Sequence, residues 1–196
     1  MGQRSQIYIR YKAVVSDFNC VASEKEILLP LYFGWNYGER MVSRAASILE
    51  YLKKDTTRSL GIDIKKLQRF AEANWDMKDI LPSVNLAEEF DTLEAPEWDK
   101  NDYIFNHDNN DGCLFVDAFD LENIKVAFTD NHKFAFGVED YLNWDINNPW
   151  REGRYVDKET IKYTERNIRF IEENSTYMSQ AEVDEFIHHS YSYSER

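Results

Sequence analysis

The feature that most constrains the fold is a meander of short apolar runs between residues 103 and 130. The runs YIF (103–105), CLFVDAF (113–119) and IKVAFTD (124–130) are rich in β-branched and aromatic residues. They are separated by DNNDG and DLEN, and clusters of Asn, Asp and Gly are typical of hairpin turns. This pattern predicts three consecutive antiparallel strands in the middle of the chain.

Two more strands are predicted near the N-terminus. In SQIYIRY (5–11) the two faces alternate, with Ile7, Ile9 and Tyr11 on one side and Gln6, Tyr8 and Arg10 on the other. A period of two is typical of a half-buried strand. The apolar run ILLPLYF (27–33) predicts a strand covered on both faces. Pro30 lacks an N–H group, which favours an edge or a bulge for that strand. The polar interval 16–26 is expected to form a loop.

Helical periodicity begins at Gly38 and predicts a helix that ends near Lys54. The pattern predicts further helices over 62–75, near 84–92 and over 157–174. It also predicts a short strand and a helical turn within 134–144.

A last helix is expected over 179–191, because Ser179 and Glu182 have the spacing of a capping box. The order of these elements predicts a single domain, 1–196, of the α+β class. Its antiparallel sheet would combine the N-terminal strands with the central meander and pack against several helices.

The charge of the chain is uneven. Its formal net charge is −13, and the acidic central segment 72–122 alone holds 15 Asp and Glu residues but only two Lys. Proteins that bind nucleic acids in general usually have the opposite balance, so this function is not expected. Such a dense cluster of acids is typical of a solvated face. Alternatively, it can imitate a phosphate backbone and occupy a basic groove on a partner protein.

Several classes of protein do not fit the sequence. No run approaches the ~18 apolar residues of a membrane span, and we expect no membrane partner and no secretion signal. Cys20 and Cys113 lack metal-site spacing, so both are expected to be reduced in a cytoplasmic protein. The common enzyme motifs are absent, and HDNNDG fails the EF-hand spacing. We therefore expect no cofactor and no metal site, and a binding protein is favoured over an enzyme.

The stretch GWNYGER (34–40) is the main candidate for a binding site. It links the strand 27–33 to the helix that starts near Gly38, and a helix N-terminus attracts phosphate. Arginine binds phosphate through two parallel hydrogen bonds, and aromatic rings stack on bases at ~1–3 kcal/mol each. If the two N-terminal strands pair, the polar face of the first would face the same cavity. The candidate ligand-binding residues are Gln6, Tyr8, Arg10, Trp35, Asn36, Tyr37, Arg40 and Arg44.

In this hypothesis Trp35 and Tyr37 stack on the ligand, while the three arginines hold its phosphate. A purely structural interpretation stays open. In that case the two aromatic residues fill the corner between sheet and helix, and Arg40 pairs with Glu39 or Glu50.

The strings MGQRSQIYIRY, YFGWNYGERMVSRA and NNDGCLFVDAF…IKVAFTD resemble a group of small uncharacterised proteins from bacteriophages and prophages. The resemblance covers about the first 55 residues and the region 102–130. It implies a phage accessory protein made in the cytoplasm of the host. Such proteins often disable host defences, either by sequestering a nucleotide signal or by covering a host protein. No site residue is inherited from the resemblance.

The sequence therefore favours a counter-defence protein that binds and sequesters a small nucleotide-like ligand. One alternative is an acidic inhibitor that uses 72–122 to cover a basic groove of a host protein. Another is a hydrolase that uses His107, His132 and nearby carboxylates. A symmetric homo-oligomer is a further expectation.

Overall fold

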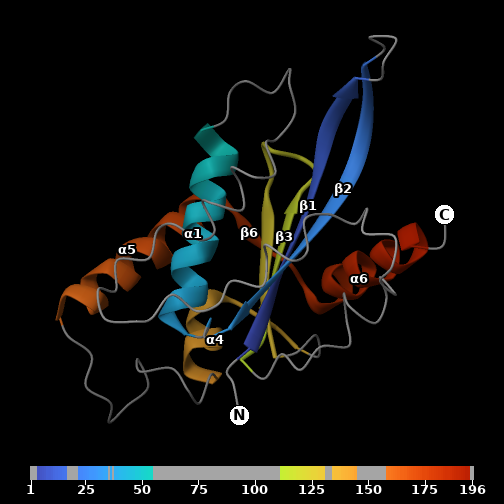
Figure 1. Ribbon diagram of the computed structural model, residues 1–196. Coiled ribbons are helices and arrows are strands. Elements are labelled where there is room, and N and C mark those ends of the chain that lie inside the picture. The colour runs from blue at the N-terminus through green and yellow to red at the C-terminus, as the bar shows by residue number, and fades with distance from the viewer. Residues whose placement is uncertain are drawn as a thin grey trace.

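The computed structural model describes residues 4–16, 22–34, 36, 38–54, 111–130, 134–144 and 158–194. These residues form an α+β fold, as the sequence predicted. Figure 1 shows a central sheet with the helices α1 (Glu39–Lys54) and α5 (Lys158–Asn174) on one side and α6 (Gln180–Ser194) on the other. The helix α4 joins α1 and α5 in the larger of the two hydrophobic clusters.

The strands form one mixed sheet in the order β2-β1-β3-β4-β5, and β6 also pairs with β4. Their bounds are β1 Arg4–Ser16, β2 Ala22–Gly34, β3 Cys113–Ala118, β4 Lys125–Thr129, β5 Ala135–Phe136 and β6 Thr176–Tyr177. The predicted strands at 113–119 and 124–130 are confirmed as an antiparallel pair, and Asn123 N–H donates to Asp120 O across their turn at 3.1 Å.

The prediction of a purely antiparallel sheet is wrong, because β1–β3 and β4–β6 are parallel. Parallel neighbours need a long crossover connection, which usually contains a helix. The connection from β1 to β3 meets this requirement, since it contains β2, α1 and the long segment that follows α1. Both parallel pairs join segments distant in the sequence, so a local pattern could not reveal them.

The predicted loop 16–26 is also wrong in part, because β1 reaches Ser16 and β2 begins at Ala22. Antiparallel pairing with β1 continues through this polar stretch, and it places Lys12 opposite Glu26. The hairpin extends beyond β3 (Figure 1). Pro30 lies in β2, the outermost described strand on its side of the sheet, as predicted.

The described helices are α1 Glu39–Lys54, α4 Val138–Trp144, α5 Lys158–Asn174 and α6 Gln180–Ser194. All four agree with the sequence pattern. The capping box of α6 is confirmed, since Ser179 N–H donates to Glu182 Oε2 at 2.8 Å and Glu182 N–H donates to Ser179 Oγ at 3.4 Å. The helices predicted at 62–75 and 84–92 and the strand at 103–105 lie outside the described residues.

Two hydrophobic clusters cover the two faces of the sheet. The larger one joins α1, α4 and α5 to one face and includes Ile7, Ile9, Tyr11, Leu114, Val116, Val126 and Phe128. The smaller one joins α6 to the other face and includes Tyr8, Cys113, Phe115, Ala127, Val183 and Phe186. The strand β1 is therefore covered on both sides along its first half, and the prediction of a half-buried strand is wrong. The cause is α6, which is more than 160 residues away in the sequence.

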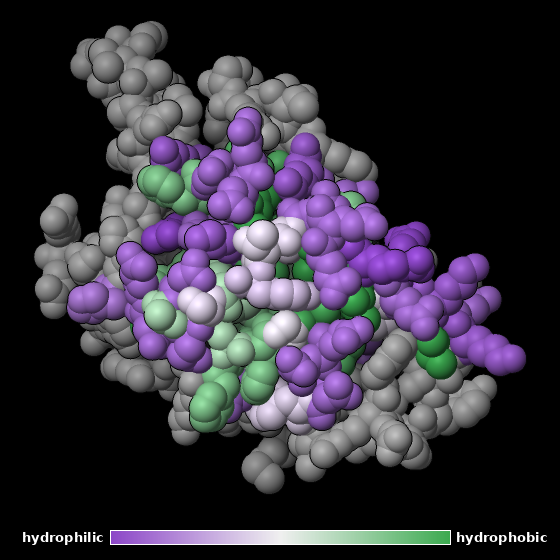
Figure 2. Space-filling model, turned by 180° about the vertical axis from the view of Figure 1, so that it is seen from behind, coloured by the Kyte–Doolittle hydropathy of each residue, from purple (hydrophilic) through white to green (hydrophobic). Residues whose placement is uncertain are grey.

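The described surface is mainly hydrophilic. Figure 2 shows one face of the molecule, on which a pale and green area interrupts a largely hydrophilic surface. Three large aromatic side chains in the described part of the chain remain exposed, namely Phe119, Phe134 and Tyr177. None of the described helices is long and apolar enough to cross a membrane.

Candidate functional site

The candidate site is built at the start of α1. Gly38 adopts a φ of 52°, in the left-handed region that favours glycine, and its carbonyl accepts the Val42 N–H at 3.3 Å. The chain thus turns sharply from β2 into α1. Glycine has no side chain that could cap the first turn of the helix. Residue 38 therefore does not offset the positive end of the helix dipole with a side chain of its own.

Asn36 holds this corner together. Its side chain is fully buried, and its Nδ2 donates to Ser5 Oγ on β1 at 2.8 Å and to Met41 Sδ at 3.2 Å. Its Oδ1 accepts a hydrogen bond from Arg44 Nη1 at 2.9 Å. The guanidinium of Arg44 is therefore fixed to β1 through one amide. The sequence singled out Asn36 as a ligand contact, but this side chain directs its described hydrogen bonds at the protein.

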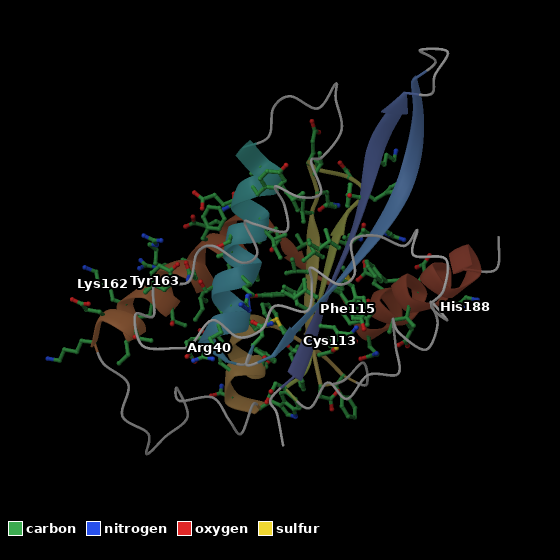
Figure 3. The ribbon with its side chains drawn as sticks, viewed as in Figure 1. Arg40, Cys113, Phe115, Lys162, Tyr163 and His188 are labelled. Atoms are coloured by element: carbon green, nitrogen blue, oxygen red, sulfur yellow. The ribbon has the colours of Figure 1, made fainter. Side chains whose placement is uncertain are left out.

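Arg40 and Arg44 lie one helical turn apart near the N-terminus of α1, and Figure 3 shows Arg40 at this end of the helix. Each residue is only 6% exposed. The spacing of Arg40, Ser43, Arg44 and Ser47 places these four residues along one polar face, away from the apolar stripe. This polar face was expected from the sequence, but its burial was not. Two arginine side chains on one helical face are therefore largely shielded from water.

The helix α5 borders this polar face. Ser43 Oγ lies 3.4 Å from Tyr163 OH, and Ser47 Oγ donates to Ser43 O at 2.9 Å. On α5, Thr164 is 1% exposed and Asn167 is 4% exposed. Within the described part of the chain, Thr164 Oγ1 and Asn167 Nδ2 have no hydrogen-bond partner.

The polar residues of α5 were not among the candidates predicted from the sequence. Thr164 and Asn167 fall on the same helical face as Ile168 and Ile171, which belong to the larger hydrophobic cluster. The sequence did contain a signal for them, because they are polar residues within an apolar stripe. Amphipathic periodicity alone does not show whether they lie at an exposed margin or a buried one.

The predicted site residues on β1 lie on the opposite face of the sheet. Tyr8 is fully buried, its OH donates to Gln6 Oε1 at 2.6 Å, and its ring stacks on Phe115 at 4.9 Å. Figure 3 shows Phe115 and Cys113 toward α6, with Arg40 on the α1 side. Gln6 and Tyr8 therefore do not share one cavity with Arg40 and Arg44.

Arg10 has a structural environment of its own. Its Nε donates to Asp117 Oδ1 at 3.1 Å and its Nη2 pairs with Asp117 Oδ2. The guanidinium also lies over the rings of Phe119 and Phe186, at 5.7 and 5.2 Å from their centroids. A bidentate carboxylate neutralises its charge, and two rings fix its plane. Arg10 thus links β3 to α6 rather than joining the arginines of α1.

The predicted site is therefore split by the sheet. Asn36, Arg40 and Arg44 are brought together on one side, and Gln6, Tyr8 and Arg10 lie on the other. The remaining two candidates, Trp35 and Tyr37, lie outside the described residues.

The structure describes few of the residues on which the alternative functions depend. His107 and His132 lie outside the described residues, as does most of the acidic central segment. Cys113 is fully buried and forms no disulfide with a described residue, and burial raises the pKa of its thiol well above the usual value. A buried thiol of this kind is a poor nucleophile. In the part of the chain that the structure describes, no cluster of His, Cys, Asp and Glu is suited to a metal ion.

Family models, curated protein sequences and solved structures were all compared with the chain, and none of them matches it. The resemblance to phage accessory proteins therefore stays a prediction.

Proposed function

We propose that this chain is a non-enzymatic binding protein that holds a small phosphorylated, nucleotide-like ligand at the start of α1. The observation that carries the proposal is the pair Arg40 and Arg44, one turn apart at the N-terminal end of a helix and each 6% exposed. A helix N-terminus and two guanidinium groups favour the same kind of ligand, which is a phosphate.

The local charge supports an anionic ligand. Arg40 and Arg44 supply two positive charges, the helix N-terminus adds a partial positive charge, and Glu39 supplies one negative charge. Because the two arginines are shielded from water, a phosphate between them would interact at a lower effective dielectric than at an open surface. The hydrogen bond from Arg44 to Asn36 fixes one guanidinium in advance, which reduces the entropy lost on binding.

The nucleotide part of the proposal comes from the sequence. Trp35 and Tyr37 flank Asn36, and aromatic rings stack on bases at ~1–3 kcal/mol each. The resemblance to phage accessory proteins suggests a biological setting, in which the protein sequesters a nucleotide signal of the host's defence. Binding without turnover is sufficient for that role.

Thermal unfolding in the presence of mono-, di- and cyclic nucleotides tests the proposal. A ligand at 100 times its Kd adds ~2.7 kcal/mol, which is a rise of roughly 5–10 °C for a chain of this size. Arg40→Gln and Arg44→Gln should abolish the rise. Arg169→Gln is the matched control, because it removes the same charge from an exposed position of α5. If the ligand still raises the melting temperature of both α1 variants, the proposed site is refuted.

A further inference from the structure

We infer that α5 supplies the second half of this site, with Asn167 and Thr164 receiving the uncharged, oxygen-rich part of the ligand. The ligand class is then a sugar phosphate or a nucleotide that presents its sugar to α5, rather than free phosphate. This inference rests on the proposed function and adds the recognition of the sugar.

The first support is that two buried polar groups of α5 lack a hydrogen-bond partner among the described residues. Asn167 Nδ2 and Thr164 Oγ1 have no hydrogen-bond partner among the described residues, although Asn167 is 4% exposed and Thr164 is 1% exposed. Most buried polar atoms in folded proteins are hydrogen-bonded, and an unsatisfied one destabilises the fold. Two such atoms, separated by less than one helical turn, indicate a place that a ligand completes.

The second support is the position of these groups beside the polar face of α1. Tyr163 OH lies 3.4 Å from Ser43 Oγ, so α5 meets α1 between Arg40 and Ser47. Asn167 follows Tyr163 by one helical turn and lies on the same side of α5. The Ser43–Tyr163 distance exceeds the usual range for a hydrogen bond between hydroxyl groups, about 2.5–3.0 Å. The contact is therefore a weak one, and it brings the two helices together at this point.

The size of the polar face selects the ligand class. From Arg40 to Ser47 the helix rises by about 10 Å, since each residue contributes about 1.5 Å. A free phosphate is one tetrahedral group and is too small to contact the whole length of this face. A sugar phosphate can place its phosphate at Arg40 and Arg44 and its hydroxyl groups near Tyr163 and Asn167.

The chemistry of the α5 groups agrees with a sugar. The amide Nδ2 of Asn167 is a donor and requires an acceptor oxygen, whereas the hydroxyl of Thr164 both donates and accepts. Sugar hydroxyl groups satisfy both requirements. Arg166 lies over the Tyr163 ring at 5.0 Å from its centroid, which holds the ring in place at the edge of the polar face.

The test uses isothermal titration calorimetry with two probes, ribose 5-phosphate and inorganic phosphate. Asn167→Leu removes the unsatisfied amide at similar volume. It should weaken binding of ribose 5-phosphate by about tenfold or more, which corresponds to loss of one good interaction. The affinity for inorganic phosphate should change by less than about twofold. The melting temperature of the ligand-free protein should rise, because a buried unsatisfied group is removed.

Asn174→Leu is the matched control on the same helix. Asn174 Nδ2 already donates to Phe170 O at 2.8 Å, so this change should lower the melting temperature and leave both affinities unaltered.

Three outcomes overturn the inference, and they are distinguishable. A lower melting temperature of ligand-free Asn167→Leu would mean that this amide is already satisfied. Unchanged affinity for ribose 5-phosphate would mean that α5 does not contact the sugar, while the phosphate site could still stand if inorganic phosphate binding depends on Arg40. Failure of the wild-type protein to bind either probe would refute the phosphate site itself, and the inference with it.

Discussion

Replacing Gly112 with alanine tests the packing that positions β3. Gly112 has a φ of 86°, and an added Cβ would lie 2.2 Å from the backbone oxygen of Thr129. Real Cβ contacts essentially never fall below 3.0 Å, so the backbones at the start of β3 and the end of β4 must separate by about 0.8 Å. The left-handed conformation costs alanine roughly 1–2 kcal/mol, and the forced separation costs about 1–3 kcal/mol.

The expected total is about 3 kcal/mol, which lowers the melting temperature of a chain of this length by roughly 6–12 °C. Differential scanning calorimetry measures the change. Gly137→Ala is the control, because its added Cβ would meet only the Tyr177 ring at 3.5 Å, an ordinary contact. Gly112→Asn isolates the steric part, since asparagine tolerates the left-handed region but still carries a Cβ. A Gly112→Ala protein that melts within about 2 °C of the wild type would refute the reasoning.

Three further predictions concern other parts of the molecule. Asn36→Leu removes the buried hydrogen bonds to Ser5 and from Arg44, so it should lower the free energy of unfolding measured by urea denaturation by about 3 kcal/mol. Lys125 and Ser179 lower the pKa of Glu182 to about 2. Glu182 therefore stabilises the fold above its ordinary pKa, and this contribution is lost as the pH falls from about 4.5 toward 2. When the urea midpoint is measured against pH, Glu182→Gln should remove the decrease that this group causes as the pH falls. In a Cys20→Ser variant, the buried Cys113 thiol should resist an aromatic disulfide reagent at pH 8 until urea unfolds the protein.

Local pattern was sufficient for most of the described elements. The period of α1, the turn between β3 and β4, and the capping box of Ser179 and Glu182 depend on neighbours in the sequence. Each is stabilised mainly by residues within a few positions, so each was predictable. The α+β class followed from their order.

Apart from the loop 16–26, the failures concern contacts between distant segments. Tyr8 was assigned to a polar face because its neighbours Gln6 and Arg10 are polar, but α6 covers that face. Lys125 and Glu182 are 57 residues apart, and their ion pair helps to hold α6 there. No local period contains such information, because burial of a second sheet face depends on where a remote helix packs.

The candidate site was predictable in part for the same reason. Arg40 and Arg44 were placed correctly on a polar face of α1, since helical spacing alone determines this. Their burial and the polar border on α5 depend on how the two helices pack. Asn167 therefore had no assigned role until the structure placed α5 against α1.

The most direct test of the phosphate site is a calorimetric titration of adenosine 5′-monophosphate into the wild-type protein and into Arg40→Gln and Arg44→Gln. The proposal predicts saturable binding to the wild type and at least a tenfold loss in each variant, about 1.4 kcal/mol or more. Variants that bind as the wild type does, while keeping its melting temperature, would contradict the central claim.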